Sequence, residues 1–144
     1  MAGELDCIFC KIVSGTIPAL KVLEDDECVS FVDIRPLAEG HLLLIPKQHF
    51  ETIDQMPAEL VGRVLRHLPR LGAAVARTAG ADGYNVLQNN GRSAGQVVPH
   101  VHFHIIPRRA GDGLGYRWPA GQYPPGRAEQ VRDQIRQALQ RLSG

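Results

Sequence analysis

The sequence has neither an excess of charge of one sign nor a long apolar run. Its 16 lysines and arginines are matched by 15 aspartates and glutamates, so the formal net charge over 144 residues is only +1. No global basic field exists to hold a nucleic-acid backbone, which favours a compact ligand over a polymer. No apolar stretch approaches the roughly 18 residues of a membrane span, and a hydrophobic content of 44% is typical of globular rather than disordered chains.

Cysteine is also scarce. The chain has three cysteines, which cannot all pair with one another, and Cys7 and Cys10 are too close together in the sequence to staple a fold. A reducing compartment is therefore the simpler expectation. Two acidic residues precede Lys11, the first lysine, and Lys11 interrupts the first apolar stretch, unlike a secretory signal. We expect a cytoplasmic protein.

The length predicts a single domain over 1–144, with a core at about 7–109 and a C-terminal Gly/Pro-rich segment and helix at 110–144. Runs of β-type residues bounded by turn residues predict five strands. These runs are 20–23, 28–33, 41–46, 84–88 and 101–106. Five strands and few helices predict an α+β fold with one sheet.

Two segments have the periodicity of amphipathic helices. After Pro57, apolar residues recur at steps of three and four through 60–75, which predicts the main helix. Pro69 lies inside this helix and predicts a kink or break near His67, for which the sequence shows no partner. A second apolar stripe at 131–142 predicts a C-terminal helix. This helix must pack either on its own sheet or on a partner subunit.

The densest chemical signal is the segment 100–106, in which His100, His102 and His104 alternate with apolar residues. On a strand, this alternation places three imidazoles on one face. Such a face is a solvated surface, a three-histidine metal centre for hydrolysis, or a nucleophilic imidazole between two supporting ones. His100 and His104 would lie about 13 Å apart on a straight strand, so one metal reaches both only if the strand bends. That makes the three-ligand centre the weaker interpretation.

A Cys-x-x-Cys pair at Cys7 and Cys10 is the second signal. Taken alone, it is compatible with a redox pair, half of a zinc site or two buried thiols. Zinc needs two more ligands, and His49 and His100 could complete a tetrahedral set of two cysteines and two histidines. Zinc is the favoured interpretation, and Cys28, in the middle of a predicted strand, is expected to be core.

Together these segments resemble the histidine triad (HIT) family of nucleotidyl hydrolases and transferases, over about 7–109. The resemblance is carried by the triad segment 100–106, Asn89, the pair Gly95 and Gln96, and the stretches 31–34 and 40–41. It implies a five-stranded antiparallel sheet with helices, extended across a homodimer.

The resemblance also implies roles for individual residues around a nucleotide. His102 becomes the nucleophile that attacks the α-phosphorus and forms a nucleotidyl-histidine intermediate. His104 and Asn89 match positions that bind the α-phosphate, Gln96 lies in the loop beside it, and Asp33 matches the position that accepts the ribose hydroxyls.

A further group would surround the base or support the phosphate. His41 matches a position near the phosphate, with a structural role as the alternative. The base pocket, suited to a purine, would be lined by Phe9, Ile12, Phe31 and Ile34, for which an ordinary core role is equally open.

The Cys-x-x-Cys pair and His49 make the chain similar to the zinc-bearing, bacterial-type branch of the family. In that branch the first triad histidine, here His100, is a zinc ligand together with Cys7, Cys10 and His49. The resemblance thus implies one structural zinc per subunit, without an open position for water. Magnesium is compatible with a polyphosphate substrate.

One departure concerns the leaving group. Val97 stands where relatives have a serine or threonine hydroxyl, and it cannot donate a proton. An amine leaves poorly without an acid, whereas a phosphate oxygen with a pKa of about 6 leaves as an anion. The sequence therefore favours dinucleoside polyphosphates or nucleotidyl anhydrides over nucleoside phosphoramidates. Two roles are open for four basic residues, contact with the outgoing phosphates or a solvated surface position: Arg92, Lys47, Arg108 and Arg109. Trp118 resembles a tryptophan that reaches towards the partner's pocket in some relatives, and packing in the core or the dimer is the alternative.

These observations predict a homodimeric HIT-type hydrolase or transferase that cleaves a bond to the α-phosphate of a purine nucleotide derivative. No nucleic acid or membrane partner is expected. The alternatives are a non-catalytic nucleotide-binding or signalling module and a zinc-dependent hydrolase that uses the triad as ligands.

Overall fold

The computed structural model describes residues 5–114 and 119–142. The chain forms two compact units, Met1–Leu114 and Gly115–Gly144, which are described separately. Trp118 lies outside the described residues. No helix among the described residues is long and apolar enough to cross a membrane.

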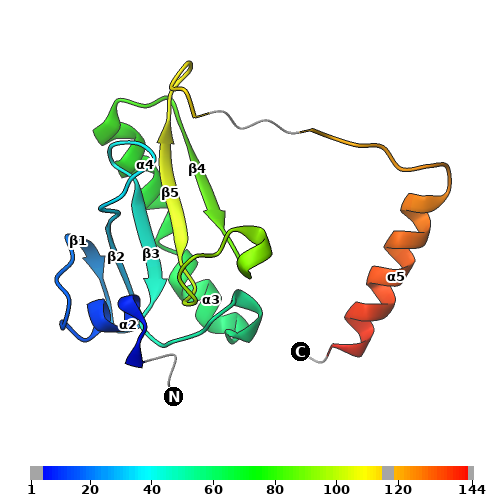
Figure 1. The fold of residues 1–144 in the computed structure, drawn as a ribbon, viewed down its shortest axis with the longest axis horizontal. Helices are drawn as coiled ribbons and strands as arrows, with labels where there is room; N and C mark the ends of the chain where they lie inside the picture. Colours follow the sequence, from blue (N-terminus) through cyan, green and yellow to red (C-terminus); the bar gives the residue numbers. More distant parts are fainter. Residues whose placement is uncertain (1–4, 115–118, 143–144) are drawn as a thin grey trace. The chain divides into compact units, whose positions relative to one another are not determined.

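The first unit is built on one five-stranded sheet whose neighbouring strands are all antiparallel. The strands follow the order β1-β2-β3-β5-β4, so β1 and β4 form the two edges (Figure 1). Their bounds are β1 Lys21–Glu24, β2 Cys28–Val32, β3 Leu42–Pro46, β4 Gly83–Gln88 and β5 Phe103–Arg108. The α+β class and the five-stranded antiparallel sheet are thereby confirmed.

The predicted main helix is divided into α3 (Ala58–Leu65) and α4 (Leu68–Ala79). The break falls at Arg66 and His67, just before Pro69, because a proline in the first turn of α4 needs no backbone donor but cannot continue α3. The predicted interruption near His67 is thus confirmed as a complete break.

Both faces of the sheet are covered. The helices α3 and α4 pack on one face, over a core that includes Leu44, Val64 and Ile105, all fully buried (Figure 1). The short helix α2 (Ile8–Val13) packs Phe9 and Ile12 on the other face, against a cluster that contains residues of β2 and β3. Burying a side chain such as Phe9 contributes about 1.5–3 kcal/mol.

The structure corrects the predicted strand at 101–106, since β5 begins only at Phe103. His100 and His102 therefore precede the strand, and only His104 lies within it. The reason is a competing set of bonds: Val101 N–H donates to the Phe50 carbonyl at 2.8 Å. The alternation of histidine and apolar residues in the sequence therefore starts before Phe103, the first residue that pairs with β3 and β4.

The second unit contains α5 (Arg127–Arg141), which confirms the predicted C-terminal helix. Its apolar side chains Val131, Ile135 and Leu139 recur at steps of four, and the second unit itself buries none of the residues of this helix. Whether this stripe packs on its own sheet or on a partner stays a prediction.

Candidate functional site

A group of histidines lies against α2 where β5 begins. The rings of His102 and His104 have centroids 4.9 Å apart, and the ring of His41 lies 5.1 Å from that of His104. Phe9 on α2 meets His102 edge to face, with centroids 5.1 Å apart. The structure thus brings together three of the predicted catalytic and phosphate-binding residues and one predicted base-pocket residue.

The tautomer of His102 is fixed by a backbone carbonyl. Its Nδ1 lies 2.7 Å from the carbonyl oxygen of His100, which can only accept, so Nδ1–H must donate. The neutral ring then carries its lone pair on Nε2. An imidazole held in this way is a nucleophile that needs no base to remove a proton.

His104 is held in the opposite tautomer by two groups behind it. The Leu37 N–H donates to His41 Nδ1 at 3.1 Å, so the neutral His41 ring carries its proton on Nε2. That Nε2 lies 2.9 Å from His104 Nδ1 and donates to it. The proton of neutral His104 therefore sits on Nε2, where it can donate to an oxyanion.

Burial keeps these rings neutral. Removal from water lowers the pKa of His102 and of His41 below the ordinary value of 6.5. It lowers the pKa of His104 to about 4, with further lowering by the neighbouring His102 and His41. Neutral rings at pH 7 are what both tautomer assignments require.

Asp33 lies beside this group. One carboxylate oxygen accepts the N–H of Arg35 at 2.8 Å, and the other lies 3.6 Å from His41 Nε2. The second oxygen is thus outside direct hydrogen-bond distance of the ring. It can accept a hydroxyl hydrogen bond.

The predicted base-pocket residues divide into two kinds. Phe9, Ile12 and Phe31 are buried in one cluster between α2 and the sheet, as the alternative of an ordinary core role anticipates. Ile34 is 83% exposed, so it is an open apolar surface next to Asp33.

The loop between β4 and β5 carries Asn89, Gln96 and Val97. Gln96 is buried and uses its amide within the protein: Oε1 accepts from Gly91 N–H at 2.7 Å, and Nε2 donates to the carbonyls of Glu51 and Val98. It shapes the loop rather than offering free donors. Asn89 Nδ2 reaches the Gly95 carbonyl only at 3.5 Å, and Val97 is 88% exposed.

The predicted metal ligands Cys7, Cys10, His49 and His100 form a cluster whose ligand atoms all lie within 4.8 Å of one another. His100 Nδ1 lies 3.3 and 3.5 Å from the two sulfurs and 3.2 Å from His49 Nδ1. In a tetrahedral zinc site of two sulfurs and two nitrogens, neighbouring ligand atoms are about 3.3–3.8 Å apart. The donor set and its spacing fit zinc.

The protonation of His100 supports this fit. Its Nε2 lies 2.8 Å from the Pro46 carbonyl and donates to it, so the lone pair on Nδ1 points at Cys7, Cys10 and His49. Burial lowers the pKa of His100 to about 4, which keeps that lone pair unprotonated. A carbonyl that fixes the outer nitrogen of a ligating histidine is a regular feature of metal sites.

A sequence model of the HIT domain matches residues 14–111. The chain belongs to the HIT family. This confirms the family resemblance, while the zinc-bearing branch stays a prediction.

HIT relatives cover most of the chain. A Candida albicans protein named adenosine 5'-monophosphoramidase is 46% identical over 125 residues, which cover 83% of this chain and 82% of that protein. An adenylylsulfatase of Arabidopsis thaliana is 45% identical over 109 residues, covering 76% of this chain but only 55% of the longer relative. A crystal structure of a HIT family member from Bacillus subtilis aligns with a TM-score of 0.87 at 38% identity, covering 96% of this chain and 99% of that one.

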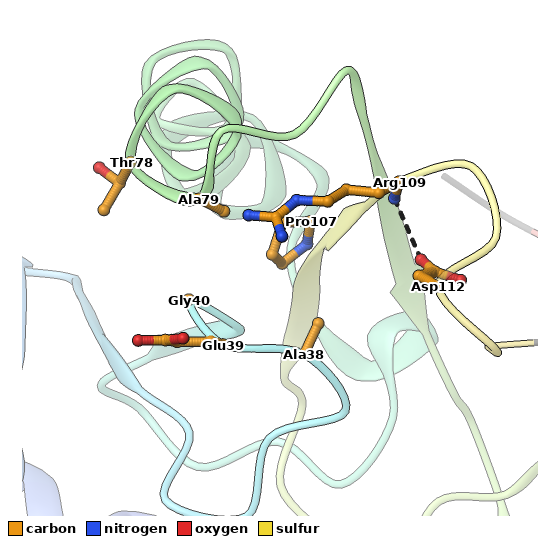
Figure 2. Close-up of a pocket in the computed structure, with 8 residues that line it drawn as sticks. All are labelled: Ala38, Glu39, Gly40, Thr78, Ala79, Pro107, Arg109 and Asp112. Atoms are coloured by element: carbon orange, nitrogen blue, oxygen red, sulfur yellow. Dashed lines mark hydrogen bonds between the residues drawn. The ribbon is translucent and has the colours of Figure 1, made fainter.

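This HIT chain also has a pocket of about 260 Å³ at the Pro107 end of β5 (Figure 2). Arg109 extends its side chain along this pocket, towards Ala79 at the end of α4, while its backbone N–H donates to Asp112. None of the lining residues is a histidine or cysteine, so the pocket holds none of the nucleophiles of the site.

Three groups that control this HIT site are backbone atoms whose identity the sequence could not give: the Leu37 N–H and the carbonyls of Pro46 and His100. Because every residue has such groups, no side-chain pattern distinguishes them. The Asp25 partner of His67, at 2.8 Å, was missed as well.

Proposed function

We propose that this protein hydrolyses a purine nucleotide derivative at the α-phosphorus through a covalent nucleotidyl-His102 intermediate. The observation that carries the proposal is the bond from His102 Nδ1–H to the His100 carbonyl, which leaves Nε2 as an unprotonated nucleophile. Relatives named adenosine 5'-monophosphoramidase and adenylylsulfatase support an adenylyl substrate.

The reaction has two displacements. His102 Nε2 attacks the α-phosphorus with its lone pair, a nitrogen–phosphorus bond forms, and the leaving group departs with the electrons of the broken bond. Water then attacks the same phosphorus, releasing the nucleoside monophosphate and restoring neutral His102. The ring carries positive charge only between these steps, and the His100 carbonyl stabilises that form by accepting from Nδ1–H.

The neighbouring groups would hold the nucleotide. His104 Nε2–H donates to an α-phosphate oxygen, where negative charge develops during attack. Asn89 would contribute a second donor after a small movement from its weak bond to the Gly95 carbonyl. The open oxygen of Asp33 accepts the ribose hydroxyls, and the exposed Ile34 offers an apolar surface to the base, while Phe9, Ile12 and Phe31 stay in the core.

The leaving group is proposed to be an oxyanion rather than an amine. Val97 is highly exposed and has no proton to give, and the N–H of His104 is committed to the phosphate. Sulfate and phosphate leave as anions without an acid, in keeping with the relative named adenylylsulfatase. A polyphosphate leaving group remains compatible with Mg²⁺.

We also propose one zinc per subunit, held by Cys7, Cys10, His49 and His100. When bound, zinc would supply structural cross-linking, since four protein ligands leave no position for water. The four residues tie α2, the segment after β3 and the segment before β5 to one point. Two thiolate ligands need reducing surroundings, which supports the predicted cytoplasmic location.

A homodimer that continues the sheet is proposed through β4. This strand is a sheet edge, and its Tyr84 and Val86 are 42% and 43% exposed. Exposed apolar edge strands favour pairing with a second chain. The molecular mass from sedimentation equilibrium reports the dimer, and a monomer at all concentrations contradicts it.

The proposed chemistry is tested by intact-protein mass spectrometry after rapid, acid-free quenching. Wild type and His102→Ala are each mixed with diadenosine polyphosphate, adenosine 5'-phosphosulfate or an adenosine phosphoramidate. We expect an added adenylyl mass in wild type alone, and a loss of turnover of roughly 10⁴-fold in the variant. Nucleotide affinity, measured by calorimetry, should change little.

Two other outcomes point elsewhere. If all compounds bind but none is consumed and no adduct forms, the protein is a nucleotide-binding module. If wild type turns over without an adduct and a chelator stops turnover before the fold is lost, the chain is a metal-dependent hydrolase.

A further inference from the structure

A second group of ligand-type side chains lies on the face of the sheet opposite Phe9, at the junction of the β1–β2 turn with the helices. It consists of Asp25, Cys28 and His67, whose ligand atoms lie within 4.8 Å of one another. Cys28 is fully buried and belongs to the core beneath α3 and α4. The proposed catalytic residues do not take part in this group.

The turn that carries Asp25 and Cys28 is held by the Asp25 carboxylate. Asp25 Oδ1 accepts the N–H groups of Glu27 and Cys28, at 2.8 and 2.9 Å. These bonds curl the chain around the carboxylate, so ligands three residues apart point to the same side. The two residues between Asp25 and Cys28 equal the shortest spacing between paired cysteine ligands of zinc.

His67 supplies a third ligand from a distant part of the chain. It lies in the break between α3 and α4, and its Nε2 is 2.8 Å from Asp25 Oδ2. The Cys28 sulfur lies within 4.8 Å of an Asp25 carboxylate oxygen and of a His67 ring nitrogen. A nitrogen, a sulfur and a carboxylate oxygen thus lie close together, and these are donor types that zinc takes.

We propose that Asp25 Oδ2, Cys28 Sγ and His67 Nε2 form a second metal site for a divalent ion of the zinc class. Zinc ligands in a tetrahedron lie about 3.2–3.8 Å apart, so the observed group needs a shift of about 1 Å or less. Water completes the fourth position, since Asp25 and His67 keep 28% and 13% of their side chains exposed.

The charges and protons balance at this site. On binding, the Cys28 thiol releases one proton to water, and His67 presents an unprotonated Nε2 to the ion. One carboxylate and one thiolate then neutralise the divalent ion. Arg66 Nη2, 3.3 Å from Asp25 Oδ2, is the competing cation, and its side chain is 61% exposed and can turn into water.

The test is a titration of the metal-free, full-length protein with Co²⁺ alone, following thiolate-to-cobalt absorption and the metal bound per chain. His67→Gln keeps an N–H donor for Asp25 but removes the imidazole ligand. Arg66→Gln is the matched control, because it removes a neighbouring cation from the same carboxylate and no ligand. Cys28→Ala, on the buried side, is a second ligand variant.

We expect wild type and Arg66→Gln to bind one Co²⁺ per chain more than His67→Gln and Cys28→Ala. This difference does not depend on the cluster at Cys7, nor on the proposed hydrolysis. If wild type and His67→Gln bind the same number of Co²⁺ ions per chain, the proposal is wrong, and the group only joins the turn to the helices by hydrogen bonds. If Cys28→Ala does not fold, the His67→Gln comparison still decides.

Discussion

At the scale of single residues, His102 and His104 are two adjacent imidazoles held in opposite tautomers. A carbonyl behind His102 leaves a lone pair at Nε2, while the Leu37–His41 relay behind His104 leaves an N–H there. One ring can therefore give electrons to phosphorus while its neighbour stabilises the oxygen that receives charge. The two tautomers differ because the Nδ1 of His102 faces a carbonyl acceptor, whereas the Nδ1 of His104 faces the N–H donor of His41.

The lowered pKa of His102 predicts the acid limb of the pH profile. Burial favours the neutral ring, so the nucleophile stays unprotonated as the pH falls through 6.5, and activity declines only in more acidic solution. Single-turnover adenylylation measured against pH checks this. Phe9→Ala, which opens His102 to water, should move the limb to higher pH. A wild-type limb centred above 6.5 contradicts the assignment.

Val97→Ser tests the leaving-group argument. A hydroxyl at this exposed position can protonate an amine, so phosphoramidate turnover should rise relative to anhydride turnover by roughly 10- to 100-fold. The ratio of kcat/KM for the two substrates is the measurement. Val97→Thr should act in the same direction and Val97→Ala should not, and an unchanged ratio in both hydroxyl variants argues against a missing acid.

The sequence could name His102 and its neighbours but not the backbone groups that set the tautomer of each ring. Histidine spacing and the surrounding motif identify the side chains, whereas the tautomers depend on the Leu37 N–H and the His100 carbonyl. The sequence also could not show that Gln96 bonds to the backbone of its own loop, because a side-chain amide can hydrogen-bond equally well to a ligand or to backbone groups.

At the scale of elements, the end of α4 depends on backbone conformation. Gly80 has φ +61°, a left-handed value that a side chain disfavours, whereas Gly62 inside α3 has open space around it. Gly80→Ala should therefore destabilise the fold by about 1 kcal/mol, and Gly62→Ala should stabilise it by up to about 1 kcal/mol. Urea unfolding measures both. Two changes of the same sign would contradict this assignment.

Strands and helices were predicted correctly where the period of apolar residues in the sequence matches the side chains that pack in the core. The five strand segments and the break before Pro69 follow from alternation and from proline chemistry, and the structure contains them. α2 was missed because six residues are too few for a helical period. β5 was placed too early because His100 and His102 continue its alternation while their backbone turns elsewhere.

At the scale of the whole molecule, the proposed zinc cluster joins segments far apart in sequence: Cys7 contacts His100 across 93 positions. Cys7→Ser with Cys10→Ser should lower the unfolding free energy by about 3 kcal/mol or more, since metal that binds only the folded chain stabilises it. Calorimetry with metal analysis checks this, and Ser14→Ala on an exposed neighbour is the control. An unchanged melting temperature contradicts a structural metal.

The cluster also constrains the order of events during synthesis on the ribosome. Residues emerge from the N-terminus onwards, so Cys7 and Cys10 are exposed to the cell long before His100 is made. Until then, the two thiols lack one of their proposed ligands and are open to oxidation or to other metals. The time needed to translate the second half of the chain is thus the period in which the thiols of a nascent chain can be oxidised or bind another metal. Chaperones or reductants that protect the thiols during that period would raise the yield of mature protein.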